Sequence, residues 1–175
     1  MSAKAVSISA VFTDLPDVMS GRDLWQVRYQ LQGGTLLVNQ GFSIFFDSGI
    51  FDSSSLTLTH SPMQGWSTFL VPYQNFPPAD AFLDAEATVN TPQTSQTFDL
   101  NFIWLGGKAL RPGSQEIDFY QIDPLSGNFT DLGSSQTQPS YAVPDSSNVL
   151  NLCFVLTLGF MIFRAVRLHP FTKTG

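Results

Sequence analysis

The stretch LWQVRYQL at residues 24–31 alternates apolar and polar side chains. Trp25, Val27, Tyr29 and Leu31 fall on one face, and polar side chains separate them. A period of two is typical of a β-strand that buries one face, because successive side chains point to opposite sides of a sheet. The stretch therefore predicts a strand that covers a core with its aromatic and aliphatic face.

The same alternation recurs along most of the chain. Residues 98–105 have apolar side chains on one side, namely Phe98, Leu100, Phe102 and Trp104. Residues 6–12, the first predicted strand, do the same with Val6, Ile8, Ala10 and Phe12. Residues 81–90 are compatible with a short helix, but their alternation favours a strand. The other predicted strands are residues 35–38, 42–46, 56–59, 66–71, 116–122 and a short edge strand at 129–132.

Turn-forming clusters separate these strands, and no segment of the body has a sustained helical period. Residues 72–79 contain Pro77-Pro78 and predict a loop, and residues 123–128 have the composition of a tight turn. Short strands without intervening helices predict an all-β fold, an antiparallel β-sandwich of the Ig-like or jelly-roll-like kind. The aromatic stripes are predicted to form its core rather than a ligand platform.

The charge distribution is uneven. Charged residues make up 13% of the chain, against about 25% in a typical soluble domain. The first 145 residues contain all fourteen Asp and Glu but only five of the eight Lys and Arg, so their net charge is −9. Because an acidic body offers no electrostatic surface for phosphates, nucleic acid is excluded as a partner.

The last part of the chain has a different character. Residues 146–163 contain no charge, and Arg164 and Arg167 follow them. A run of this length can cross a bilayer as a helix, which we place at about residues 148–166. Basic residues tend to stay in the cytoplasm, so the body is expected outside. The alternative is that the apolar run forms a buried helix or strand of the folded body.

The sequence therefore predicts three parts. Residues 1–132 form the β-sandwich, residues 133–142 form a polar linker, and residues 143–175 carry the single C-terminal transmembrane helix. An exported body needs a signal peptide, and the first residues show no apolar segment of that kind. Ala3-Lys4-Ala5 has the small-x-small spacing of a cleavage site, so we expect that a signal precedes the recorded start or was removed.

The tail resembles a known bacterial signal. Residues 143–147 (VPDSS), the apolar run and the basic pair resemble the sorting signal of exported PEP-CTERM-type proteins, in its Val-Pro-Asp-Ser-Gly version. Ser147 stands where that version has Gly. Residues 41–47, 102–107, 111–115 and 119–123 are also similar to segments that recur in such proteins.

This resemblance implies a route of delivery and no catalytic activity of the body. It implies recognition by an exosortase, a membrane transpeptidase-like enzyme, then transfer of a membrane-anchored precursor to the cell surface or extracellular matrix. The residues that it implies as functional are the sorting motif Val143, Pro144, Asp145 and Ser146 and the basic anchor Arg164 and Arg167. Pro144 suits such a motif because it cannot continue a helix and keeps the segment extended.

The body offers little for catalysis. A Ser–His–Asp triad would have to use His60, since no other histidine precedes the tail, and no Gly-x-Ser-x-Gly elbow supports one. We therefore predict that the protein is not an enzyme and needs no cofactor. If a metal binds, the candidates are calcium ligands in carboxylate-bearing loops. These weak candidates are Asp47, Asp52, Asp80 and Asp84.

The predicted function is that of a non-enzymatic, exported cell-surface or matrix protein. The alternative is an envelope-tethered carbohydrate-binding module, in which Trp66 and Tyr73 stack on a polysaccharide. Exposure of these rings would favour this alternative, and burial would favour a structural role. A hydrolase with clustered carboxylates and a packing subunit of a larger surface assembly also stay open.

Overall fold

A computed structural model of the chain describes residues 6–17, 19–62, 64–71, 74–75, 78–92, 97–107 and 109–142. Every regular element in these ranges is a strand. The strands are β1 (Ser7–Asp14), β2 (Asp23–Gln32), β3 (Thr35–Leu36), β4 (Gln40–Phe46), β5 (Phe51–His60), β6 (Trp66–Val71), β7 (Gln74–Asn75), β8 (Pro78–Ala79), β9 (Ala81–Ala87), β10 (Thr91–Pro92), β11 (Thr97–Trp104), β12 (Glu116–Ile122), β13 (Phe129–Gln136) and β14 (Gln138–Tyr141).

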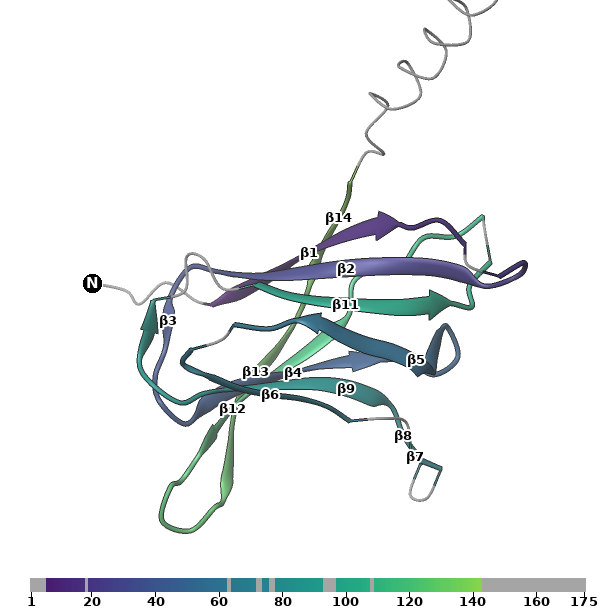
Figure 1. The fold of residues 1–175 in the computed structure, drawn as a ribbon. Helices are drawn as coiled ribbons and strands as arrows, with labels where there is room; N and C mark the ends of the chain where they lie inside the picture. The colour runs from purple at the N-terminus through teal and green to yellow at the C-terminus, as the bar shows by residue number, and fades with distance from the viewer. Residues whose placement is uncertain are drawn as a thin grey trace, which may run out of the picture. The chain divides into compact units, whose positions relative to one another are not determined.

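The long strands form two five-stranded sheets that face each other (Figure 1). The first, here called the β2 sheet, has the order β14-β1-β2-β11-β5, and the second, the β4 sheet, has the order β13-β12-β4-β9-β6. Most pairings are antiparallel, and β1 with β14 is parallel. The predicted all-β sandwich is therefore confirmed. The chain crosses between the two sheets several times, as it does in both Ig-like and jelly-roll-like sandwiches.

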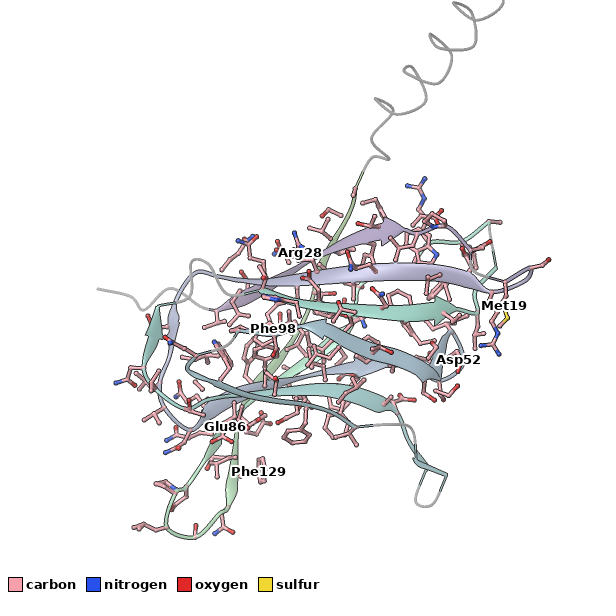
Figure 2. All side chains as sticks on the ribbon, in the orientation of Figure 1. Met19, Arg28, Asp52, Glu86, Phe98 and Phe129 are labelled. Carbon is pink, nitrogen blue, oxygen red and sulfur yellow. The ribbon has the colours of Figure 1, made fainter. Side chains whose placement is uncertain are left out.

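The core lies between the sheets and uses the predicted faces. Trp25, Val27, Tyr29 and Leu31 are all buried, as are the matching side chains of β1 and β11. Phe98 lies between the two sheets (Figure 2), and its ring contacts Phe42 and Trp66 edge to face. Edge-to-face aromatic packing of this kind adds about 0.5–1.5 kcal/mol per pair to the gain from burial.

The segment predicted as a linker is part of the sandwich. β13 extends to Gln136, and β14 pairs with β1 from Ser9–Gln138 to Phe12–Tyr141. The chain changes sheet at Thr137, which is buried and exchanges two hydrogen bonds with Gln115. The linker prediction for residues 133–142 is wrong because these polar residues pair through their backbone, which composition does not report.

The other local predictions are largely confirmed. Residues 81–90 contain the strand β9 rather than a helix, and Asp123 accepts hydrogen bonds from two backbone amides of the predicted turn. The predicted loop at residues 72–79 contains the two-residue strands β7 and β8. His60, which follows the predicted strand at residues 56–59, is the last residue of β5.

The predicted transmembrane helix lies outside the described residues, and so do residues 143–175 as a whole. Within the ranges given above, the chain forms no helix with the length and hydropathy needed to cross a bilayer.

Candidate functional site

The outer face of the β4 sheet carries aromatic side chains as well as polar ones. On β4, Phe42, Ile44 and Phe46 point into the core, so Ser43 and Phe45 point outward. The same alternation turns Phe82 of β9 outward, and its ring lies 5.7 Å from that of Phe45. These strands therefore carry aromatic side chains on their outer face in addition to the apolar side chains on their inner face.

The outward side chains line a groove with a volume of about 540 Å³, which lies in the usual range for ligand sites of about 300–1,000 Å³. We call it the aromatic–acidic groove. Its lining residues are Ser43, Phe45, Phe69, Phe82, Asp84, Asp118, Phe119, Tyr120, Phe129 and Asp131.

Asp84 lies at the floor of the groove and is held by two neighbouring strands. The Ser43 hydroxyl donates to one carboxylate oxygen and the Tyr120 hydroxyl to the other, both at 2.8 Å. Ser43 lies directly opposite Asp84 in the sheet, whereas the Tyr120 side chain reaches across β4 from β12. Two donors on two strands fix the position of this carboxylate.

Gly41 makes this reach possible. A Cβ atom at position 41 would lie 2.5 Å from Cζ and the hydroxyl oxygen of Tyr120 and 2.7 Å from the Ala85 carbonyl oxygen. Because glycine has no Cβ, the Tyr120 ring can lie against the backbone of β4. Gly41 is therefore required for the observed floor of the groove.

Burial changes the acid–base properties of this pair. Asp84 is 8% exposed, and burial raises the pKa of its carboxyl group, although the hydrogen bonds from Ser43 and Tyr120 oppose the shift. Burial also raises the pKa of Tyr120, and its hydrogen bond to Asp84 acts in the same direction. Tyr120 therefore stays protonated and acts as a donor to Asp84.

The rim of the groove is exposed and charged. Phe69 is 51% exposed and Phe129 is 70% exposed, and the Phe129 ring lies 5.3 Å from that of Tyr120. Figure 2 shows Phe129 on the side of the β4 sheet that faces away from the core. Asp118 lies one strand from Ser43, and Asp131 lies opposite Tyr120. Among the described residues, every charged side chain that lines the groove is thus an aspartate.

The predicted stacking pair does not form this site. Trp66 is 9% exposed and packs against Phe42 and Phe98, so its ring is part of the core and is not available to a sugar. This prediction was wrong for Trp66 because its side chain lies on the inward face of β6. Tyr73 lies outside the described residues.

The calcium candidates lie at three separate places, and two of them share one turn. Asp47 and Asp80 each accept a hydrogen bond from a backbone amide of the turn that follows β4, and Asp52 accepts from Ser54 on β5. Asp84 belongs to the groove in the β4 sheet. In the part of the chain that the structure describes, no three His, Cys, Asp or Glu side chains are arranged to hold a metal ion.

His60 is exposed at the end of β5, in the other sheet from the groove. The sorting motif Val143, Pro144, Asp145 and Ser146 and the basic pair Arg164 and Arg167 lie outside the described residues.

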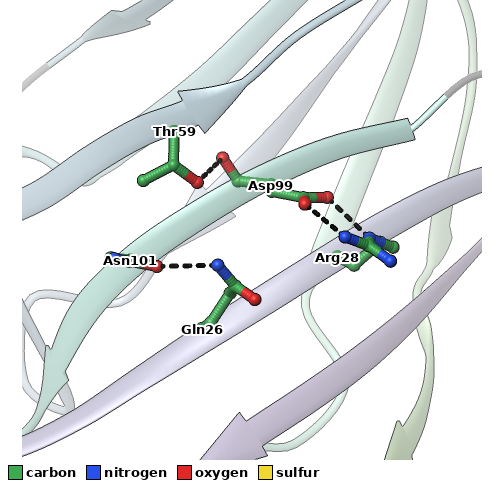
Figure 3. Close-up of polar contacts among 5 residues, drawn as sticks. All are labelled: Gln26, Arg28, Thr59, Asp99 and Asn101. Atoms are coloured by element: carbon green, nitrogen blue, oxygen red, sulfur yellow. Dashed lines mark hydrogen bonds and ion pairs between the residues drawn. The ribbon is translucent and has the colours of Figure 1, made fainter. Parts of the chain in front are cut away.

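The outer face of the β2 sheet is built differently. Arg28 donates two hydrogen bonds to Asp99, at 2.9 and 2.7 Å, and Gln26 donates to Asn101 at 3.2 Å (Figure 3). Both pairs lie directly opposite each other on β2 and β11. Hydrogen bonding to Asp99 raises the pKa of Arg28 above its ordinary value. This face is a ladder of polar pairs.

The groove residues were missed by the sequence analysis, which assigned aromatic residues to the core. A signal for them exists in FSIFF (residues 42–46) and AFLDA (residues 81–85). In both segments, apolar residues occupy odd as well as even positions, which point to opposite faces of the sheet. A strand buried on one face needs apolar side chains at every second position only. The extra phenylalanines at 45 and 82 mark the outer surface.

The fold and the groove together define a β-sandwich with a candidate binding surface on one outer face. No protein-family model matches the chain, and a comparison with curated proteins finds no relative. Among solved structures, it is similar to a cohesin module from the Clostridium perfringens ATCC13124 family 33 glycoside hydrolase (11% identity, 79% of this chain and 100% of that chain, TM-score 0.36).

It is also similar to the seventh ScaB type I cohesin from Pseudobacteroides cellulosolvens, at 9% identity over 79% of this chain and 96% of that chain, with a TM-score of 0.31. A third structure, described as BspA_C_WT, is 15% identical over 77% of this chain and 50% of that chain, with a TM-score of 0.30. Similarity at this level assigns neither a family nor a function.

Proposed function

We propose that this protein is a non-enzymatic binding module, exported and displayed at the bacterial cell surface or in the extracellular matrix. The observation that carries the binding role is the aromatic–acidic groove, where exposed phenylalanines surround a fixed carboxylate. Exposed aromatic side chains gathered in a groove are typical of recognition surfaces, because leaving them in water costs free energy that a partner recovers.

The proposed delivery rests on the tail sequence. The motif at residues 143–146, the uncharged run at 146–163 and the basic residues Arg164 and Arg167 support recognition by an exosortase and a membrane-anchored precursor. β14 ends at Tyr141, so the motif begins two residues after the last strand. In this proposal the enzyme reaches the motif without unfolding β14.

Fractionation of the native cells tests the delivery. An antibody against the β-sandwich should find the protein at the surface or in the matrix, and mass spectrometry of the mature form should give a C-terminus upstream of Arg164. Joint substitution Pro144→Ala and Asp145→Ala should retain the precursor in the membrane. Ser20→Ala, at an exposed turn, is the matched control and should behave as wild type.

Two results would contradict the proposed delivery. Intact Arg164 and Arg167 on the mature protein would contradict processing, although not export. Recovery of the protein inside the cell would contradict both.

The carbohydrate-binding alternative no longer has Trp66 to support it. It would have to use the exposed rings of Phe69 and Phe129, and it is tested together with the ligand of the groove below.

A further inference from the structure

We propose that the aromatic–acidic groove binds a protein partner that inserts an arginine or lysine side chain from an apolar surface. This inference rests on the proposed role as a binding module, and it names the chemistry of the partner. Three observations support it: the negative charge of the groove, the exposed aromatic side chains at its walls, and the fixed carboxylate of Asp84 at its floor.

The first argument is charge. Asp84, Asp118 and Asp131 line one groove, and no Lys or Arg is among the described residues that line it. The ion pair between Arg28 and Asp99 lies on the other sheet. Asp118 and Asp84 flank Ser43 across two strand spacings, about 9–10 Å. A cation between them lowers the electrostatic energy of both carboxylates, so the groove is complementary to positive charge.

The second argument is the walls. Phe69 and Phe129 are exposed and present aromatic surface next to the aspartates. A cation over an aromatic face gains about 0.5–1 kcal/mol at an exposed site and about 2 kcal/mol when it is desolvated. The methylene stem of an arginine or lysine packs against the same rings while its head reaches a carboxylate. Carboxylates beside phenylalanines thus match both halves of such a side chain.

The third argument is the floor. Asp84 is buried, yet Ser43 and Tyr120 already fix both of its oxygens. Because its position is already fixed, Asp84 loses little conformational entropy when a cation enters the groove. A neutral sugar would donate hydroxyl hydrogen bonds to the aspartates but would leave their three negative charges without a counter-charge. The observations therefore favour a cationic protein surface over a neutral polysaccharide.

Acid should weaken the interaction. Among the described residues, Ser43 from β4 and Phe69 from β6 lie opposite Asp84, and Tyr120 from β12 donates to it. Glu86 on β9 and Asp118 on β12 are the next charged groups, and Asp118 lies opposite Ser43. None of them is a cation, so protonation of the carboxylates removes the attraction for the ligand. Because burial raises the pKa of Asp84, this carboxyl takes up its proton at a higher pH than an ordinary aspartate.

The test uses the full chain in a non-ionic detergent and a labelled peptide of leucine, alanine and arginine, with fluorescence anisotropy as the readout. A matched peptide has glutamine in place of each arginine. We expect the arginine peptide to bind at least about tenfold more tightly, and high salt to reduce the difference. Equal affinity for the two peptides would overturn the inference.

Substitutions locate the binding. The double substitution Asp118→Asn and Asp131→Asn should lower the affinity for the arginine peptide by about tenfold, because two partly exposed carboxylates are lost. Asp14→Asn removes a carboxylate from the end of β1 in the other sheet and should leave the affinity for the arginine peptide unchanged. Phe69→Ala removes an exposed ring without changing charge and should also weaken binding. Equal losses in the groove and control variants would show nonspecific attraction and overturn the proposal.

A cello-oligosaccharide provides the second arm of the test. If it binds, loses affinity in Phe69→Ala, and the arginine peptide does not bind, then the partner is a polysaccharide and the inference is wrong while the binding role stands. The surface location is tested independently by cell fractionation. Failure there would remove the proposed delivery and leave the peptide result intact.

Discussion

On the outer face of the β2 sheet, polar side chains pair with each other across the strands, whereas on the outer face of the β4 sheet, phenylalanines and aspartates face solvent around a groove. Both faces arise from the same alternation of side chains. On the first face, Arg28 with Asp99 and Gln26 with Asn101 satisfy each other's hydrogen-bonding or charge requirements. The second leaves apolar surface and negative charge unmatched, which is the condition for binding something else.

The largest effect is expected from the inner face of the β4 sheet, whose side chains should contribute far more to the free energy of unfolding than those of its outer face. Phe42→Ala removes a buried ring that contacts Trp66, Phe98 and Phe119, and we expect a loss of about 3–5 kcal/mol in the free energy of unfolding. Phe69→Ala, on the outer face, should stay within about 0.5 kcal/mol of wild type. Urea denaturation measures both, and similar losses would show that Phe69 serves the fold rather than a ligand.

The next effect concerns the floor of the groove. Gly41→Ala forces the new Cβ against the Tyr120 ring and the Ala85 carbonyl, so we expect a loss of about 1–3 kcal/mol and weaker binding of the arginine peptide. Gly113→Ala is the control, because a Cβ there meets no atom within 4 Å. If Gly41→Ala melts at the wild-type temperature, then the packing of Tyr120 against β4 is not as tight as described.

On the β2 sheet, the polar ladder should be tested at Arg28. Arg28→Ala leaves Asp99, whose side chain is 9% exposed, without its cation. Since the Arg28 side chain is 57% exposed, water screens the pair and we expect a loss of about 1 kcal/mol that shrinks in high salt. Gln30→Ala on the same strand is the comparison. A loss that salt does not change would indicate packing by the arginine stem instead of charge.

The smallest expected effect is a pH trend at Asp84. Burial raises the pKa of the folded state, so the folded protein binds more protons than the unfolded chain between the two pKa values. Protonated Asp84 therefore contributes to the free energy of unfolding. This contribution is fully present below the pKa of Asp84 in the unfolded chain, about 3.9, and it is lost as pH rises through the pKa of Asp84 in the folded protein.

Asp84→Asn cannot titrate at this position. The stability of wild type relative to this variant should therefore fall as pH rises above about 4, as followed by urea midpoints at each pH. A difference that stays constant with pH would mean that the carboxyl group is not desolvated.

The sequence was sufficient for the strands that bury one face. The spacing of Trp25, Val27, Tyr29 and Leu31 predicts β2 because the period of side chains is a local property. The tight turn at Asp123 was predictable for the same reason, since its hydrogen bonds reach two and three residues along the chain.

The groove and β14 depend on contacts between distant residues. Tyr120 meets Asp84 across 36 positions, and Ser140 donates to the Ala10 carbonyl across 130. No local pattern reports which strands become neighbours, so the partners of Asp84 were not foreseen and residues 133–142 looked like a spacer. The wrong assignment of Trp66 has another cause, because an isolated Trp at the start of a strand does not reveal which face it takes.

The parallel pairing of β14 with β1 has a mechanical consequence. Their register runs from Ser9–Gln138 to Phe12–Tyr141, and the Ala142 amide adds a bond of 2.8 Å to the Phe12 carbonyl. Tension between the start of β1 and the end of β14 pulls the two strands past each other lengthwise. The interstrand bonds then share that load and must yield together, whereas an antiparallel hairpin pulled from its open end would unzip one bond at a time.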